Sequence, residues 1–397
     1  MAMAVPIGRK IELLRLRRGM SREVLAQLVG RSGEWLRQVE RQQRPLQNLP
    51  VLLELARVLG IQDLSEFLGA PAAMPPALRR PPCSALRDAV LTRHRTGGGG
   101  PSDPPVGRTA EAVADAVDRA WHAWHQRSQR YSFGMSVLPG LLAGTAWTAR
   151  VGRQAGTGAH AYHLASVILH RMHDTTAALL AADRGLSAAL ASGEPDTIAA
   201  LRMRYGCALA DGGMLDAARA ELAALAESLH AGGRGTAWKV SALLAGAQIA
   251  AREADWDRSN GLLREARTLC AEVPGDAHGQ AVAQEAVLAT MAVEHASGRD
   301  REALRAAEAL DLTAARHRVD WRTRTFLQLS KVYLAVSDIP SAVISLIQMD
   351  EACEEEVKYN PTACRLAAEL AARADANARA KLWPLLDRSA MPPAPSR

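Results

Sequence analysis

The sequence has little of what marks membrane and secreted proteins. Aromatic residues make up only 4% of its 397 residues. It holds no uninterrupted apolar run of the roughly 18 residues that a membrane-spanning helix needs. The chain becomes charged and amphipathic directly after Met1–Pro6, so it lacks the apolar core of a signal peptide. We expect a cytoplasmic protein with no membrane partner.

Cysteine is also scarce. The five cysteines are odd in number, widely separated and without a C-x-x-C pair, which argues against a disulfide framework and against a thiolate zinc site. They are Cys83, Cys207, Cys270, Cys353 and Cys364. The last four fall in predicted helices, which favours reduced thiols in a cytosolic protein. A redox sensor is the alternative.

Motifs for catalysis are missing as well. The sequence has no Walker loop, no G-x-S-x-G and no Cys–His pair on a strand framework. The glycine run Gly97–Gly100 lacks the following lysine and the flanking strand of a phosphate-binding loop, so it predicts a linker. We predict no enzymatic activity and no cofactor.

Four histidines crowd one predicted helix and raise the alternative of a metal site. They are His160, His163, His170 and His173. His163 and His170 share a face, but their separation corresponds to about 10 Å of helix rise, which is too far for one ion. The histidines three positions apart offer only two ligands, without a nearby cysteine or a clear acidic third ligand. We predict no metal.

The net charge is unevenly distributed. Residues 1–97 contain sixteen Arg and Lys against eight Asp and Glu, a net charge of +8. Since the whole chain carries +6, the remaining residues carry −2. A basic N-terminal part on a nearly neutral remainder is the charge distribution of a small DNA-binding domain attached to a larger one.

The stretch Ser21–Pro45 has the pattern of two short helices with a sharp turn between them. Ser21 is a good N-cap for the first helix. Gly30 supplies the backbone freedom for the turn, and Ser32 caps the second helix. The apolar face of the first helix consists of Leu25, Ala26 and Val29.

The second helix has a thin apolar stripe and a polar outer face, which suits insertion into the major groove of DNA. Leu36 and Val39 face inward. Arg pairs with guanine, Gln with adenine, and Glu accepts from cytosine. The residues expected at base edges are Glu34, Trp35, Arg37 and Gln38. Those expected at phosphates, near helix N-termini or in flanking loops, are Arg22, Ser32, Arg41 and Arg44. Gly33 completes the predicted DNA-binding set, and Trp35 contacts either a thymine methyl or the backbone.

Helices on both sides complete a five-helix domain at residues 1–70. Ile7–Arg18 is amphipathic and ends at Gly19. Val51–Leu59 and Asp63–Leu68 follow. The predicted inward residues of the outer helices are Ile7, Ile11, Leu14, Leu52, Leu55, Ala56 and Leu59.

Several short stretches of this domain match a known family. They are Arg15–Ser21, Leu25–Ala26, Gly30–Ser32, Leu36, Val39–Arg41, Pro45 and Leu55–Gly60. With them, residues 7–69 resemble the phage-repressor (Cro/C1, or XRE) helix-turn-helix family. The resemblance implies that Arg15 and Glu40 form a buried ion pair joining the first helix to the recognition helix. The sequence departs from the family pattern at Arg22, Gly33, Trp35 and Gln42.

A linker rich in Pro and Gly, residues 71–106, separates this domain from the rest. Within it, Ser84–His94 predicts one short helix. The linker arginines either belong to a plain tether or add phosphate contacts. They are Arg79, Arg80, Arg93 and Arg95. Residues 391–397 predict a disordered tail.

Residues 107–390 predict helix after helix without a strand, and they contain a repeat. Five stretches begin with a turn residue and reach a small residue five positions later, at the start of an apolar helix. They are His173–Ala178, Gly213–Ala218, Ala254–Ser259, Gly298–Ala303 and Ser337–Ala342, at spacings of 40, 41, 44 and 39. Stacked hairpins of this kind form a solenoid whose concave surface can hold peptides or small ligands. The predicted fold class is all-α: a small five-helix helix-turn-helix domain followed by an α-solenoid.

The repeats resemble tetratricopeptide-like hairpins, with a longer period than the usual 34 residues. The stretches Trp121–Trp124, Arg130–Tyr131 and Leu138–Pro139 extend the resemblance to a group. These are XRE-type regulators with a C-terminal tetratricopeptide domain, common in GC-rich Gram-positive bacteria. Peptide-pheromone receptors of other Gram-positives are more distantly similar. The resemblance implies a homodimeric transcriptional regulator of double-stranded operator DNA, with a peptide or small-molecule effector in the solenoid. The alternative is a tetratricopeptide scaffold for a protein partner.

Aromatic residues at the start of the repeat domain admit two interpretations. Trp121 and Trp124 are three positions apart on one helix face, followed by Tyr131. We predict that they pack the first hairpin, and an aromatic ligand wall is the alternative. Tyr205 and Trp238 belong either to the concave surface or to the core.

Overall fold

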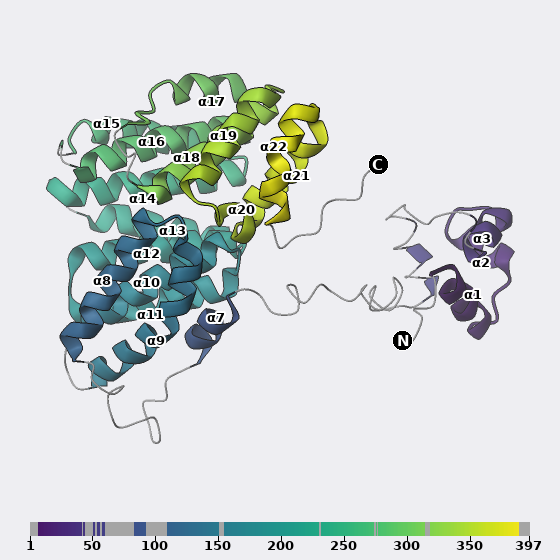
Figure 1. Ribbon diagram of the computed structural model, residues 1–397, viewed down its shortest axis with the longest axis horizontal. Helices are drawn as coiled ribbons and strands as arrows, with labels where there is room; N and C mark the ends of the chain where they lie inside the picture. Colours follow the sequence, from purple (N-terminus) through teal and green to yellow (C-terminus); the bar gives the residue numbers. More distant parts are fainter. Residues whose placement is uncertain are drawn as a thin grey trace. The chain divides into compact units, whose positions relative to one another are not determined.

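Figure 1 shows the computed structural model of the chain, in which every element of the described residues is a helix. The structure describes residues 7–41, 83–92, 109–150, 155–229, 232–273, 277–313 and 318–388, and the separate positions 43, 51, 54–55, 58–59 and 275. The chain divides into two compact units, Met1–Pro81 and Pro82–Arg397, called here the N-terminal and C-terminal units.

The N-terminal unit begins with three short helices around a small core. They are α1 (Ile7–Arg17), α2 (Arg22–Leu28) and α3 (Gly33–Glu40). As predicted, Ser21 and Ser32 are N-caps: their hydroxyls accept from the backbone N–H of Val24 at 3.2 Å and of Trp35 at 3.1 Å. Gly30, in the turn between α2 and α3, has a φ of 65°, which a residue with a Cβ rarely adopts.

The core of this unit agrees with the predicted inward faces where residues are described. Its members are Ile11, Leu25, Ala26, Val29, Leu36, Val39, Val51, Leu55 and Leu59. Gly8 shows how closely α1 approaches α3, since a Cβ there would lie 2.2 Å from the carbonyl oxygen of Val39. Leu52, Ala56 and the predicted helix Asp63–Leu68 lie outside the described residues.

The C-terminal unit is a stack of helical hairpins (Figure 1). Its helices are α7 (Ser84–Leu91), α8 (Ala110–Gln126), α9 (Arg130–Arg150), α10 (Ala155–Arg171), α11 (Thr175–Ser192), α12 (Pro195–Asp211), α13 (Leu215–Ser228), α14 (Gly233–Arg252), α15 (Trp256–Cys270), α16 (Ala277–Ala296), α17 (Asp300–Ala307), α18 (Val319–Ala335), α19 (Ile339–Ala352), α20 (Glu356–Tyr359), α21 (Pro361–Arg373) and α22 (Ala376–Asp387). Each of α8, α10, α12, α14, α16 and α18 packs on the helix that follows it and on the first helix of the next hairpin. The predicted all-α class, a helix-turn-helix domain followed by helical repeats, is confirmed.

The repeat found in the sequence marks the hairpin turns. The first residue of each of the five stretches has a left-handed backbone, with φ between 58° and 79°: His173, Gly213, Ala254, Gly298 and Ser337. The small residue five positions later is at most 1% exposed in every case: Ala178, Ala218, Ser259, Ala303 and Ala342. A small side chain at this point lets the two helices of a hairpin approach closely.

Hydroxyl groups reinforce three of these close contacts. Ser166 donates to the carbonyl of Ala178 at 2.9 Å, and Ser330 donates to the carbonyl of Ala342 at 2.8 Å. Ser259 is itself the small residue and donates to the carbonyl of Ala247 at 2.8 Å. The buried hydroxyls therefore have partners that lie in the facing helix of the same hairpin.

The short helix predicted in the linker is present, but it belongs to the C-terminal unit. In α7, Leu86 and Val90 are fully buried, and α7 packs on α9, α10 and α11. Arg184 of α11 donates to the carbonyl of Thr92 at 3.4 Å, and Arg87 lies 3.6 Å from the carboxylate of Asp174. The helix α7 therefore belongs to the compact unit Pro82–Arg397, while the start of the repeat domain at residue 107 stays a prediction.

The two ends of the hairpin stack are in contact. At the start of α9, the Arg130 guanidinium donates to the Glu356 carboxylate of α20 at 2.7 Å and to the Thr323 hydroxyl of α18 at 2.8 Å. Glu355 accepts from the backbone N–H groups of Tyr131 at 2.8 Å and of Ser132 at 3.1 Å. These contacts close the array, because they join its first hairpin to its last turns.

The two tryptophans of α8 pack in the core of the C-terminal unit. Trp124 is 3% exposed, and the Trp121 indole donates to the carbonyl of His160 at 3.1 Å, so the predicted packing of the first hairpin is confirmed.

Every cysteine is a free thiol. Burial raises the pKa of Cys83 to about 11 and that of Cys353 to about 12, which opposes the thiolate that a redox sensor needs. Cys353 follows α19 as its C-cap instead of lying within a helix.

No helix in the part of the chain that the structure describes is long and apolar enough to cross a membrane.

Candidate nucleic-acid interface

The position of α3 depends on a buried carboxylate at its end. Arg15 of α1 donates from Nε to Glu40 Oε1 at 2.7 Å, and Arg22 of α2 donates from Nε to Glu40 Oε2 at 2.5 Å. Arg15 also donates from Nη1 to the carbonyl of Met20 at 2.7 Å. The Arg15–Glu40 pair implied by the family resemblance is confirmed. Together with the bond from Arg22, it fixes α3 against both preceding helices.

Arg22 belongs to this support, a role that the sequence analysis missed. Its Nη2 lies 3.5 Å from Glu12 Oε1, in addition to the bond to Glu40, and its side chain is 35% exposed. The hydrogen bond and the charge of Glu40 raise the pKa of Arg22. Two carboxylates therefore neutralise Arg22 in this structure, while its phosphate contact stays a prediction. The signal was its departure from the family pattern, an arginine where glutamine is common.

The outer face of α3 carries an exposed carboxylate with its own partners. Glu34 accepts from Arg37 Nε at 2.7 Å, from Arg37 Nη2 at 2.5 Å and from Gln38 Nε2 at 3.2 Å. The hydrogen bond from Arg37 lowers the pKa of Glu34. Three of the four predicted base-contacting residues thus form one group, in which Glu34 orients the two donors.

Trp35 and Gly33 lie partly against the rest of the N-terminal unit. Trp35 is half-buried and packs against the core, while the Arg31 guanidinium lies 5.9 Å from its ring centre. A Cβ added at Gly33 would lie 3.4 Å from Glu23 Oε1, so this position faces α2.

Two of the four predicted phosphate-contacting residues, Ser32 and Arg41, lie at the ends of α3. The exposed Ser32 stands at its N-terminus, with the hydroxyl already accepting from the backbone of Trp35. Arg41 is exposed and is the C-cap residue of α3. Arg44 lies outside the described residues. The group on α3 therefore has a polar residue at each end of a face formed by Glu34, Arg37 and Gln38.

In the C-terminal unit the four clustered histidines have separate partners. His160 Nε2 lies 3.7 Å from Glu194, and His170 Nδ1 lies 2.7 Å from Asp211. His163 stands edge-on to the Trp121 ring, and His173 Nε2 lies 3.2 Å from the Thr362 hydroxyl. Among the residues that the structure describes, no three ligand side chains come together at a metal site.

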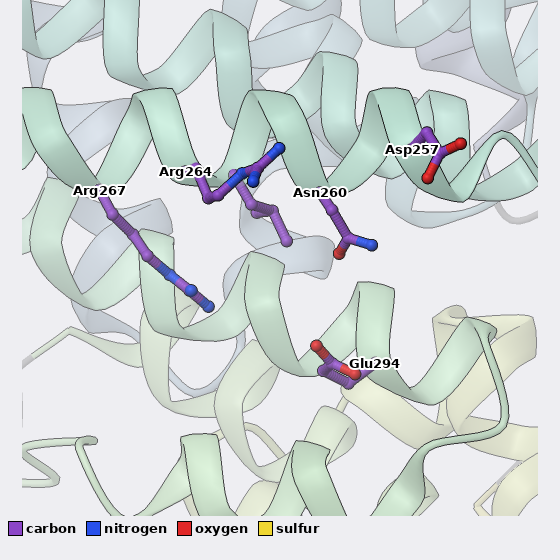
Figure 2. A pocket seen from close by; sticks show the side chains of 6 residues that line it. Asp257, Asn260, Arg264, Arg267 and Glu294 are labelled. Carbon is purple, nitrogen blue, oxygen red and sulfur yellow. The ribbon is translucent and has the colours of Figure 1, made fainter.

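A shallow polar pocket lies between α15 and α16, with a volume of about 580 Å³. Figure 2 shows Asn260 and Arg267 extending from α15 toward the helix that carries Glu294. The lining residues are Asp257, Asn260, Leu263, Arg264, Arg267 and Glu294. Arg267 donates to the Thr290 hydroxyl at 3.1 Å, and Glu294 accepts from Arg299 at 2.5 Å. The charges of the pocket balance one another, so it has no strong preference for a charged ligand.

A protein-family model described as a helix-turn-helix domain matches residues 6–67. Neither a curated protein nor a solved structure matches the chain. The match covers α1, α2 and α3 and the supporting ion pairs. Residues 6–67 are therefore a helix-turn-helix domain, a class of fold that places its second helix in the DNA major groove. This domain precedes the helical repeats of the C-terminal unit.

Proposed function

We propose that the protein is a sequence-specific DNA-binding transcriptional regulator of the XRE type. The observation that carries the proposal is the outer face of α3, where Arg37 and Gln38 stand side by side and both donate to the exposed Glu34. Arginine and glutamine are the side chains that pair bidentately with guanine and adenine. The buried Glu40 supports this face from behind, so the donors stand on a fixed helix.

The basic N-terminal part supports the same conclusion. Its net charge of +8 over residues 1–97 attracts the phosphate backbone, and the exposed Arg41 lies beside the predicted base contacts. Phosphate contacts supply affinity and position, while the groove contacts of α3 supply sequence preference. The two kinds of contact lie next to each other on one small domain.

We further propose that two chains bind paired half-sites, with the repeat unit mediating dimerisation and holding an effector. A single small domain buries too little DNA surface for a specific regulator, and two-fold related half-sites solve this. Hairpin repeats of the tetratricopeptide kind offer the extended surface that such contacts need. Sedimentation of the full chain, with and without an operator of two half-sites, tests the proposed dimer. A monomeric protein in both samples would contradict it.

The main test is a salt series of DNA binding. Operators are first selected from random DNA with the full chain, and affinity is then measured at several salt concentrations. We expect the double variant Arg37→Ala, Gln38→Ala to lose the preference for the selected sequence, by about 1–3 kcal/mol per lost base contact. Arg305→Ala, an exposed arginine of α17, is the matched control. Equal sequence preference in the double variant would contradict the assignment to α3.

A second test separates affinity from specificity at Glu34. In Glu34→Gln the two donors lose their carboxylate partner, and one negative charge disappears from the DNA-facing surface. We expect tighter binding to random DNA and weaker discrimination of the operator, measured by fluorescence anisotropy on both. The control Glu227→Gln changes a carboxylate of α13 in the C-terminal unit. Unchanged binding to both DNAs would show that Glu34 does not face DNA.

A further inference from the structure

The pocket between α15 and α16 has opposite charges at its two ends. Along α15 its lining side chains run from Asp257 through Asn260 to Arg264 and Arg267, and Glu294 of α16 faces the Asn260 end (Figure 2). These charges balance in sum, but they are separated in space. An ion of one sign therefore gains little in this pocket, whereas a ligand with one positive and one negative group finds a partner for each.

At the cationic end, Arg267 is held in place without a counter-charge. Its Nη2 donates to the Thr290 hydroxyl at 3.1 Å, and that hydroxyl donates in turn to the carbonyl of Ala286 at 2.8 Å. Thr290 is 6% exposed, so it is a fixed acceptor. Within the described residues no carboxylate forms an ion pair with Arg267, and its Nε and Nη1 have no hydrogen-bond partner. The guanidinium thus keeps oriented donors for a ligand.

At the anionic end, Glu294 keeps a matching acceptor. Its Oε2 accepts from Arg299 Nε at 2.5 Å, while its Oε1 accepts from no group in the part of the chain that the structure describes. The side chain is 17% exposed, and this partial shielding from water strengthens a charge pair. Thr290, which holds Arg267, and Glu294 are four residues apart on α16, so these two anchors are separated by about 6 Å of helix rise.

The surface between the two charges suits a small organic molecule. Leu263, which is 2% exposed and belongs to the core, is the apolar member of the lining. Asn260 is half-buried, and among the described residues its amide has no hydrogen-bond partner. Such an amide offers a donor and an acceptor. The volume of about 580 Å³ is within the range of small-molecule sites.

We propose that this pocket binds a free α-amino acid, with the carboxylate on Arg267 and the ammonium group on Glu294. Two charge-assisted hydrogen bonds of about 2.8 Å, together with the short distance between the charges of an α-amino acid, bridge anchors about 6 Å apart. A longer zwitterion places its charges too far apart. Asn260 adds a hydrogen bond, and the side chain of the ligand packs on Leu263.

A ligand in this position contacts two consecutive hairpins, α14–α15 and α16–α17, and stabilises their packing. The binding itself goes beyond the proposed function. Only the further step, in which the amino acid acts as the effector of the regulator, rests on that function.

Thermal unfolding and calorimetry of the full chain test the proposal. The probes are the protein amino acids, added singly, followed by the amide and the N-acetyl derivative of the one that binds best. The amide lacks the carboxylate, and the N-acetyl derivative lacks the ammonium group. We expect at least one amino acid to raise the Tm by about 2–4 °C at a hundredfold excess over its Kd. Both derivatives should bind about tenfold to hundredfold more weakly, because each loses a charge-assisted hydrogen bond.

Two variants assign the charges to their partners. Arg267→Gln should bind the amino acid about tenfold to hundredfold more weakly and bind its amide as the native chain does. Glu294→Gln, which keeps an acceptor for Arg299, should show the same loss and bind the N-acetyl derivative as the native chain does. The controls Arg258→Gln and Glu265→Gln, at exposed positions of α15 outside the pocket, should bind all three ligands like the native chain.

The retained binding of one derivative by each variant distinguishes a lost partner from a lost fold. A variant of Arg267 or Glu294 that loses all three ligands equally would overturn the assignment of separate partners. Undiminished binding of the amino acid by either variant, or no response of the native chain to any amino acid, would overturn the proposal as well. Operator binding by α3 is measured separately, so failure here leaves the DNA-binding proposal untouched.

Discussion

Both units hold an arginine–glutamate pair that water hardly reaches, and the two pairs have different surroundings. In the N-terminal unit, the Arg15 and Glu40 side chains are 6% and 1% exposed, and 25 positions separate them. In the C-terminal unit, Arg130 and Glu356 are both 0% exposed, and 226 positions separate them. The first pair connects neighbouring helices within one motif, whereas the second joins the two ends of a repeat array.

The pairs also differ in how well their polar atoms are satisfied. Arg15 shares Glu40 with Arg22 and has the Met20 carbonyl as a further acceptor. Arg130 donates only from Nη2, while its buried Nε and Nη1 have no hydrogen-bond partner and its guanidinium lies 4.3 Å from the Trp124 ring centre. The pair within the helix-turn-helix motif has further hydrogen-bond partners in adjacent turns. The Arg130–Glu356 pair, which joins the two ends of the array, has fewer hydrogen bonds, because the charge of Glu356 and the aromatic face of Trp124 stand in place of the missing acceptors.

The largest effect is expected from breaking the closing pair. Glu356→Gln leaves Arg130 buried without a counter-charge, which typically costs about 3–5 kcal/mol. Urea unfolding followed by the helical circular dichroism of the full chain measures the loss. The double variant Arg130→Met, Glu356→Leu is the matched control, since well-packed apolar residues should restore most of the stability. A loss below about 1 kcal/mol in the single variant would show that the ends of the array do not need this pair.

A smaller effect is expected from the equivalent change in the N-terminal unit. Glu40→Gln removes the carboxylate that Arg15 and Arg22 share, but Arg15 keeps the Met20 carbonyl and Arg22 is 35% exposed. We expect a loss of about 2–3 kcal/mol, the usual contribution of hydrogen bonds to a charged group. We expect this loss of stability to appear as faster limited proteolysis within residues 7–41 and as weaker operator binding.

Arg22→Gln is the control for that change. It introduces the residue that is common in the XRE family and leaves the Arg15–Glu40 pair in place. We expect a cost below about 1 kcal/mol, as for an exposed ion pair. If Arg22→Gln weakens the domain as much as Glu40→Gln does, then Arg22 is the principal partner of Glu40, and the family pattern misdescribes this chain.

The comparison also shows how far the sequence could predict this molecule. The caps Ser21 and Ser32 and the turn at Gly30 depend on a few adjacent residues, and all three were predicted. The five hairpin turns were found because each repeats a local pattern, a left-handed residue followed by a small one. Caps and turns of this kind involve only a few neighbouring residues, so general rules of backbone conformation predict them.

The contacts that could not be predicted depend on the arrangement of whole helices. Nothing near Glu355 or Glu356 indicates that these residues meet the start of α9, because the meeting depends on the accumulated twist of the intervening hairpins. At the proposed DNA-binding site, residue types and their positions on α3 were predictable. Which partner each side chain takes was not predictable, because each can reach several partners by changing its rotamer. Examples are the bonds of Glu34 to Arg37 and Gln38, and the bond of Arg22 to Glu40.

An effect about as small as that of Arg22→Gln is a pH dependence in the C-terminal unit. Burial, followed by the charges of Arg204, His160 and His125, lowers the pKa of His163 to about 3. In the unfolded chain a histidine has a pKa near 6.5. Between these values the unfolded chain binds a proton that the folded chain does not, so stability is lost as the pH falls below about 6.5, by at most about 1.4 kcal/mol per pH unit.

His163→Phe should make this loss smaller. Phenylalanine can keep the edge-on contact with the Trp121 ring, whose centre lies 4.9 Å from that of His163, but it cannot bind a proton. The Tm of the full chain at pH 7.5 and at pH 5.5 measures the difference, and we expect the variant to fall by less, with a gap of about 1 kcal/mol. His122→Gln, at an exposed position of α8, should follow the native chain. If His163→Phe also follows it, His163 takes up its proton in the folded state, and the region beside Arg204 is wetter than its burial indicates.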